Sequence, residues 1–277
     1  MSLLEKIYSF LSFEIEAPKT YGIFHLISVA FVIVLTTILC KKCIKSSENT
    51  ERKLAFWFWV ILAVFEIYKQ FIYLFDTSDG FVVDYAWHGF PFQLCSSPLY
   101  VLPLIAFLPS GKIREAFVAF YGTFVLLGGI AVYIYPGNVF TETLGINVHT
   151  MLWHGSQIFL GIYFNLRRFA SKDSPDFKKY YASAVPIFLL FITVAVMLNE
   201  IFFKIFTAKG MDDEFNMFFI SPHFECMFPV LDTIQANTPY PVFLFSYILI
   251  LSAFSFAILY VEAFFAKRHI EKTKIKG

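Results

Sequence analysis

Long apolar runs separated by short polar segments dominate the hydrophobic pattern of this chain. Runs of about 20 apolar residues are long enough to cross a bilayer as α-helices. Seven such runs lie near residues 21–40, 54–75, 92–109, 115–135, 149–169, 181–203 and 241–265. The pattern therefore predicts an all-α, polytopic membrane protein that folds as a seven-helix transmembrane bundle. The third and fifth runs differ from the others because each carries several polar residues.

The amino-acid composition favours the same class of protein. Of the 277 residues, 58% are hydrophobic and only 16% are charged, whereas a soluble domain averages about 25% charged residues. We find no internal repeat, low-complexity tract or soluble domain, so residues 1–277 are predicted to form a single integral membrane domain. The net charge of +1 gives no reason to expect a nucleic-acid partner.

Lysine and arginine are distributed unevenly between alternate loops. Segments 41–53, 110–114, 166–180 and the tail from residue 267 together carry 17 of them, whereas segments 1–20, 76–90, 136–148 and 204–240 carry four. Because positive residues accumulate on the cytoplasmic side of membrane proteins, we expect the N-terminus outside and the C-terminus in the cytoplasm. The expected location is the cell membrane, with multiple passes.

Two outer segments stand apart from the predicted spans. Within residues 1–20, apolar side chains recur at helical spacing, at Leu3, Leu4, Ile7, Phe10 and Leu11. This spacing predicts an amphipathic helix on the outer surface, with a frayed terminus as the alternative. The basic start of a cleavable signal peptide is not found here. Residues 204–240 are expected to form an outer loop or a re-entrant segment.

Polar side chains inside the apolar runs collect in the half of each predicted helix that faces outside. They are His25, Glu66, Lys69, Gln70, Gln93, Cys95, Ser96, Ser97, His149, His154, Gln157, Asn199 and Glu200. A charged group in the bilayer costs several kcal/mol unless it faces the protein interior or water. We therefore expect a polar cavity open toward the outer leaflet, and nearly apolar inner halves.

The charged and histidine side chains allow more than one interpretation. Glu66 and Lys69 are three residues apart, so they can pair on one helical face, either to fix that helix in the bundle or to face a substrate. A histidine in a membrane helix can simply hydrogen-bond to a neighbouring helix. His149 and His154 do not share a face, so we expect only one to be central, with His149 near the helix end and Gln157 beside His154.

Cysteine usage offers a candidate nucleophile. Cys95 can be a small apolar filler, a disulfide partner of Cys226, or a nucleophile activated by a histidine such as His154 at matching depth. Cys40 and Cys43 have the spacing of half a metal site, but no second pair accompanies them. We therefore expect neither a metal nor a cofactor.

A Cys–His pair in an apolar layer suits acyl chemistry on a lipid. The thiolate would attack an acyl carbonyl, form a thioester, and pass the acyl group to water or to a hydroxyl acceptor. Ser96, Gln93 or Asn199 would then donate hydrogen bonds to the oxyanion.

Several stretches resemble a known family. The segments "FEIYKQFIYLF", "PFQLCSSPLYVLPL", "VHTMLWHGSQIFLGIY", "NEIFFKIF" and "PYPVFLF" resemble motifs of the YwaF-type bacterial integral membrane proteins. More distantly, they resemble eukaryotic transmembrane phospholipid acyltransferases and androgen-induced membrane hydrolases. The resemblance implies Cys95 as nucleophile, His154 as base and a bacterial plasma membrane. Gln93 departs from the bacterial pattern, which often has histidine there, and this puts a proton relay at that position in doubt.

Two main functional hypotheses follow. The first is an intramembrane acyltransferase or lipid hydrolase, acting on a membrane lipid or acyl-lipid substrate in an outer-leaflet pocket. Its catalytic residues are Cys95 and His154, and its substrate-binding residues are Glu66, Lys69, Gln93, Ser96, His149, Gln157 and Asn199. The alternative is a non-enzymatic transporter or ligand-binding membrane protein that uses the same cavity, and a purely structural membrane protein is a third reading.

Overall fold

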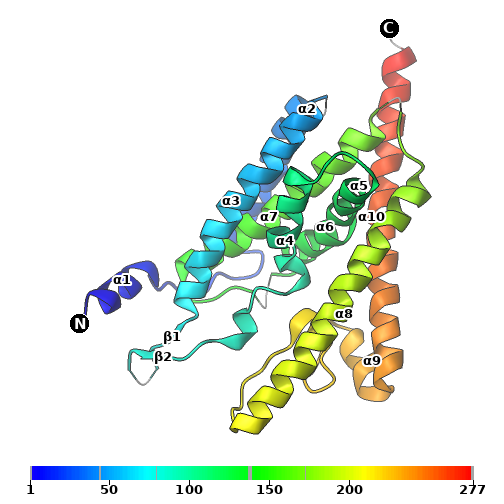
Figure 1. Ribbon diagram of the computed structural model, residues 1–277. Helices are drawn as coiled ribbons and strands as arrows, with labels where there is room; N and C mark the ends of the chain where they lie inside the picture. Colours follow the sequence, from blue (N-terminus) through cyan, green and yellow to red (C-terminus); the bar gives the residue numbers. More distant parts are fainter. Residues whose placement is uncertain (1, 44, 79, 137–138, 172, 276–277) are drawn as a thin grey trace.

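The computed structural model describes residues 2–43, 45–78, 80–136, 139–171 and 173–275 (Figure 1). The long helices are α2 (Ile23–Cys43), α3 (Glu48–Ile72), α7 (Leu144–Phe169), α8 (Phe177–Lys209) and α10 (Tyr240–Ile275). The shorter helices are α1 (Leu3–Leu11), α4 (Pro98–Phe107), α5 (Lys112–Phe120), α6 (Leu126–Ile134) and α9 (Leu231–Asn237). Figure 1 shows α1 and α9 toward one end of the bundle and the C-terminus at the other.

The remaining elements are short. Three 3₁₀ turns are η1 (Trp87–Gly89), η2 (Leu94–Ser96) and η4 (Met217–Phe219). A π-helical turn, η3 (Tyr121–Val125), joins α5 to α6. Strands β1 (Phe75–Asp76) and β2 (Val82–Val83) pair in antiparallel register beyond the end of α3.

Five helical stretches of the described chain are long and apolar enough to cross a membrane. They are Ile23–Lys42, Glu48–Ile72, Lys112–Ile134, Phe177–Lys209 and Tyr240–Ala266. The prediction of a mostly helical protein with several membrane spans is therefore confirmed. The two weaker runs differ: the apolar helix over Leu94–Phe107 is shorter, and α7 is not among the five because polar residues interrupt its apolar sequence.

Prolines limit the third run. Pro98 occupies the first turn of α4, where its missing N–H costs no hydrogen bond. Leu108 ends the helix in an extended conformation, as expected for a residue that precedes a proline, here Pro109. Gly111 then adopts a φ of 156°, which an L-residue rarely takes, and α5 begins at once.

Helix α7 occupies the centre of the bundle. It contacts α2, α3, α5, α6, α10 and η3, and buried residues recur along its whole length. The close approach of α6 requires a glycine, because a Cβ at Gly129 would lie 2.9 Å from both the His154 carbonyl oxygen and Gln157 Cβ. The polar helix is therefore shielded by its neighbours.

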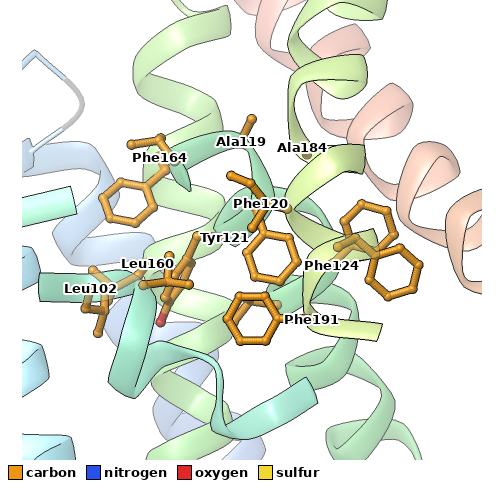
Figure 2. Close-up of a cluster of buried hydrophobic side chains, with 14 of the residues drawn as sticks. Leu102, Ala119, Phe120, Tyr121, Phe124, Leu160, Phe164, Ala184 and Phe191 are labelled. Carbon is orange, nitrogen blue, oxygen red and sulfur yellow. The ribbon is translucent and has the colours of Figure 1, made fainter. Parts of the chain in front are cut away.

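Stacked aromatic rings join the α5–η3 segment to α8 (Figure 2). The ring centroids of Phe124 and Phe188 lie 4.1 Å apart, and those of Phe120 and Phe191 lie 5.3 Å apart, with interplanar angles of 12° in both pairs. All four side chains are buried. Offset pairs of this kind add about 0.5–1.5 kcal/mol to the energy of area burial, so α8 is held firmly along this contact.

The half of the bundle that the sequence assigns to the cytoplasmic side is less apolar than we expected. Asn165 Nδ2 donates to the Gly122 carbonyl in the π-turn at 2.6 Å and to Glu262 Oε2 at 2.5 Å. Tyr180 donates its hydroxyl to Asn165 Oδ1 at 3.1 Å. The expectation of nearly apolar inner halves is therefore wrong at Asn165 and Glu262, which join α7 to α10.

A buried carboxylate organises the end of the bundle opposite α1. Glu51 is fully buried in α3 and accepts hydrogen bonds from Arg114 of α5 at 2.6 Å, from Arg167 of α7 at 2.6 Å, and from Arg168 of α7. Arg114 is itself 1% exposed and also donates from Nε to the Ile105 carbonyl. One anion thus connects three helices.

We expect Glu51→Ala to destabilise the protein by about 3 kcal/mol, the lower end for a buried pair that loses one partner, because Arg114 and Arg168 keep the half-buried Glu115 as counter-charge. Thermal unfolding of the purified protein in detergent measures the loss. Glu16→Ala is the control, since among the described residues Glu16 pairs with Lys19 alone and both side chains are exposed. Equal unfolding temperatures for the two variants would contradict this role of Glu51.

Candidate functional site

Buried polar atoms without a partner recur on α3 and α7. Among the described residues, seven buried side-chain nitrogen or oxygen atoms have no hydrogen-bond partner, and five of them belong to side chains of these two helices, here called the α3–α7 cluster. These are Glu66 Oε2, both ring nitrogens of His149, His154 Nε2 and Gln157 Oε1. Buried polar groups nearly always have a partner, whether protein or ordered water. This cluster is therefore where water or the polar atoms of a ligand would bind.

Glu66 forms the acidic part of this cluster. Its Oε1 accepts from Lys69 Nζ at 2.8 Å and from Gln70 Nε2 at 2.7 Å, which confirms the predicted ion pair. Gln70 also donates to the Gly89 carbonyl and accepts from the Tyr85 hydroxyl at 2.5 Å. One carboxylate oxygen is thus fully engaged, while Oε2 faces the unpartnered group.

Tyr85 lies in the segment between α3 and α4, outside the spans. Burial raises its pKa to about 12, and the negative charge of Glu66 acts in the same direction. The hydroxyl therefore stays protonated at neutral pH and keeps donating to Gln70. This bond fixes the Gln70 amide and, through it, the orientation of the Glu66 carboxylate.

His149 lies between Glu66 and Trp153. Its Nε2 is 3.7 Å from Glu66 Oε2, which is too long for a hydrogen bond. The imidazole stacks on the Trp153 indole, with ring centroids 5.0 Å apart. His149 is held by packing, and its ring nitrogens remain available to a ligand.

Cys95 lies in η2, which is docked onto α7. The Cys95 carbonyl oxygen accepts from Trp153 Nε1 and from Gln157 Nε2, both at 2.6 Å. The two donors are one helical turn apart, and His154 lies between them in the sequence. The structure thus brings the backbone of the candidate nucleophile to the turn that carries the candidate base. The Cys95 side chain is half-buried.

The hydrogen bonding of His154 fixes its tautomer. Its Nδ1 lies 2.8 Å from the Thr150 carbonyl oxygen, and a carbonyl can only accept, so Nδ1 carries the proton. Nε2 therefore has a free lone pair, and it is buried with no partner among the described residues. This protonation pattern is the one a general base needs.

Ser96, the next residue of η2, is buried, and the Ser97 hydroxyl donates to the Leu94 carbonyl at 2.7 Å.

A family model described as the TMEM164 family matches residues 20–260. The chain belongs to the TMEM164 family. The matched range contains the whole of the α3–α7 cluster, η2 and the segment after α8. No curated protein and no solved structure matches the chain. Membership of a transmembrane family supports a multi-pass membrane protein, while the YwaF-type relationship and the bacterial plasma membrane stay predictions.

Gln93 and Asn199 play a different part in this TMEM164-family chain. Asn199 accepts from the Met217 N–H at 2.7 Å and donates to its carbonyl at 3.0 Å. Gln93 accepts from the Phe218 N–H at 2.6 Å and donates to the Asn216 carbonyl. Both amides hold η4, where Phe218 adopts the left-handed φ of 60°. We therefore assign them to positioning this turn rather than to the oxyanion.

Two further amides, which the sequence did not single out, fold the rest of the segment between α8 and α10. Asn216 accepts from the Ser221 N–H and donates to the Glu225 carbonyl. Gln235 donates to the carbonyls of Ser221 and Phe224 and accepts from the Cys226 N–H. Residues 211–237 thus form a folded cap. A count of polar residues in the spans misses Asn216 and Gln235 because both lie outside the apolar runs.

The cysteines of the TMEM164-family chain form no disulfide among the described residues. Cys95 and Cys226 are both thiols, so the disulfide alternative for this pair is not realised. No group of three or more histidine, cysteine, aspartate or glutamate side chains in the described part has the arrangement of a metal site. The side chain of Cys43 lies outside the described residues.

We expect Asn199→Leu to loosen the cap, because it leaves the buried N–H and carbonyl of Met217 unpaired at a cost of about 1–3 kcal/mol each. Limited proteolysis of the detergent-solubilised protein should then cleave residues 211–230 faster than in the wild type. Asn237→Leu is the matched control, since Asn237 is exposed and its side chain bonds, within the described part of the chain, to Thr233 of the same helix. Cleavage at the same rate in both variants would contradict the role of Asn199.

Proposed function

We propose that this chain is an intramembrane acyltransferase or lipid hydrolase in which Cys95 is the nucleophile and His154 is the general base. The observation that supports this proposal is the bare Nε2 of His154, buried at the turn of α7 onto which the Cys95 carbonyl is docked. A buried imidazole with its Nδ1 proton fixed and its Nε2 unpartnered is prepared to accept a proton.

The reaction would proceed in two steps. In the first, His154 Nε2 takes the proton from Cys95 Sγ while the sulfur attacks the carbonyl carbon of an acyl ester. The C–O bond of the ester breaks, the leaving alkoxide takes the proton from His154, and the acyl group stays on Cys95 as a thioester. In the second step, His154 deprotonates water or an acceptor hydroxyl, which attacks the thioester and restores the Cys95 thiol.

The rest of the cluster would bind the polar part of the lipid. The unpartnered atoms of Glu66, His149 and Gln157 are available to hydroxyl or ester groups, and Lys69, which pairs with Glu66 at 2.8 Å, and Ser96 would complete the polar lining. The cap, held by Gln93 and Asn199, would limit access of water. In this proposal these two amides act through the cap, and the other predicted substrate-binding residues contact the lipid.

The proposed function also requires an orientation in the membrane. We infer seven spans, with α4 and α7 added to the five that are apolar throughout, the N-terminus outside and the C-terminus in the cytoplasm. Surrounded by other helices, α7 can lie at membrane depth despite its polar residues. The site then faces the outer leaflet, from which a lipid can enter sideways.

A ligand-binding or transport function remains the second candidate, because the same unpartnered atoms suit any polar ligand. A transporter needs a path to the other side of the membrane. Here the opposite end of the bundle is occupied by Glu51 and its three arginines, which counts against such a path. The enzymatic proposal differs from this candidate in requiring a reactive thiol.

We expect a thiol-reactive probe with a long acyl chain to label Cys95 of the purified protein in lipid vesicles. His154→Ala should slow this labelling at least about 100-fold, within the range attributed to general bases, and Cys95→Ala should abolish it. Cys226→Ser is the control and should be labelled like the wild type. Mass spectrometry of the labelled peptide identifies the site.

The labelling experiment distinguishes the two candidates. If Cys95 reacts at the same rate with and without His154, the thiol is not activated and the acyl-transfer proposal fails. Circular dichroism and unfolding temperature of His154→Ala show whether a slower reaction reflects lost folding instead. A folded variant with normal labelling would favour the ligand-binding candidate.

A further inference from the structure

The helix α1 presents an apolar face that no other described part of the chain covers. Its N-terminus is closed by a capping box, in which the Ser2 hydroxyl accepts from the Glu5 N–H and the Glu5 carboxylate accepts from the Ser2 N–H. Leu3 and Phe10 are 75% and 81% exposed, and Phe13 just beyond the helix is 61% exposed. The exposed apolar side chains of the segment are Leu3, Leu4, Ile7, Phe10 and Phe13.

The opposite face of α1 is polar. At 100° per residue, Glu5 and Ser9 lie on the side away from Leu3 and Ile7, and Lys6 borders the apolar face next to Phe10. A helix with this division is suited to a boundary between water and an apolar phase. It is unsuited to either phase alone, because one face would always be in the wrong solvent.

The helix is fixed to the bundle at a defined position. The Tyr8 ring packs against Phe71, Phe75 and Phe81, with centroids 5.3–6.2 Å apart, and the Tyr68 hydroxyl donates to the Leu11 carbonyl at 2.9 Å. The chain that follows α1 pairs with residues 142–144 through backbone hydrogen bonds. The apolar face is thus held in place, although nothing in the described chain covers it.

The depth of this attachment coincides with the boundary of a bilayer. The part of the predicted span that α3 forms, from Leu54 to Ile72, is about 28 Å long at about 1.5 Å per residue, which is close to the thickness of a hydrocarbon core. Tyr8 contacts α3 at Phe71, at the end of this stretch. The helix therefore lies where acyl chains give way to headgroups.

The surface beside α1 is also apolar and exposed. Helix α2 begins with Ile23, which is 80% exposed, and continues with exposed Ile27 and Phe31. Exposed Tyr21 and Tyr135 lie at the same end, and tyrosines are enriched at membrane interfaces. Figure 1 shows α1 lying beyond the bundle and crosswise to α3. In a membrane, lipid surrounds the exposed apolar side chains of α2. The same bilayer would therefore cover the apolar face of α1.

We propose that α1 is an interfacial membrane-binding helix: its Leu3–Phe10 face is embedded at the headgroup–acyl boundary on the side of the membrane that carries the Cys95–His154 site. The exposed Ser9 faces water, and the exposed Lys6 lies at the border of the embedded face. The proposed enzymatic function is not needed for this binding, which rests on the position and exposed face of α1 alone.

Cysteine accessibility tests this arrangement in the full-length protein. Phe10→Cys, Leu3→Cys and Ser9→Cys are placed singly in the otherwise unchanged chain and reconstituted in pure phosphatidylcholine vesicles. Freeze–thawing exposes both sides of the membrane to a polyethylene-glycol maleimide that does not enter bilayers. The mass shift on a gel is followed over time, the labelling of the wild type is subtracted, and rates are normalised to those in sodium dodecyl sulfate.

We expect Ser9→Cys to react at least about tenfold faster than Phe10→Cys and Leu3→Cys in vesicles. Equal normalised rates at the three positions would overturn the proposal, because all three would then be in water. A second copy of the chain is the competing occupant, so the measurement is repeated at a tenfold lower ratio of protein to lipid. Protection of residue 10 that disappears on dilution would also overturn membrane binding.

Discussion

The structure depends on a helix that cannot face hydrocarbon. Helix α7 carries buried polar side chains along its length, among them Asn147, His149, His154, Gln157 and Asn165. In a bilayer each such group needs a protein or water partner. The arrangement of the other helices follows from this need: α2, α3, α6 and α10 surround α7, and glycines on α6 let its backbone approach.

Side-chain amides meet a second requirement of the membrane environment, the pairing of irregular backbone. Gln157 supports the turn at Cys95, Asn165 supports the π-turn, and Asn199 supports the cap. An amide suits this task because it carries a donor and an acceptor without a charge. Side-chain amides thus support the fold and also position the candidate nucleophile, so Gln157 belongs both to the helix packing and to the candidate site.

The sequence predicted those features that depend on local spacing. The Glu66–Lys69 pair follows from helical periodicity and is present, whereas the site of Cys95 and His154, predicted by counting depth along the spans, stays a proposal. Other features depend on distant parts of the chain and have no local pattern: Asn165 meets Glu262, 97 residues away, and Gln93 meets the backbone of η4. An amide in a span indicates a polar partner but not which one, so Gln93 and Asn199 were expected at an oxyanion instead.

The π-turn η3 also sets the direction that the following helix faces. It accommodates one residue more than a regular α-helix of the same rise, and each residue turns an α-helix by about 100°. Tyr133 of α6 donates its hydroxyl to the Met151 carbonyl of α7 at 2.8 Å. Without the extra residue of η3, α6 would rotate about its own axis, and Gly129 and Tyr133 would turn away from α7. The face of α6 that packs on α7 therefore depends on the number of residues in η3. Deletion of one residue from η3 would disturb the bundle more than most substitutions there.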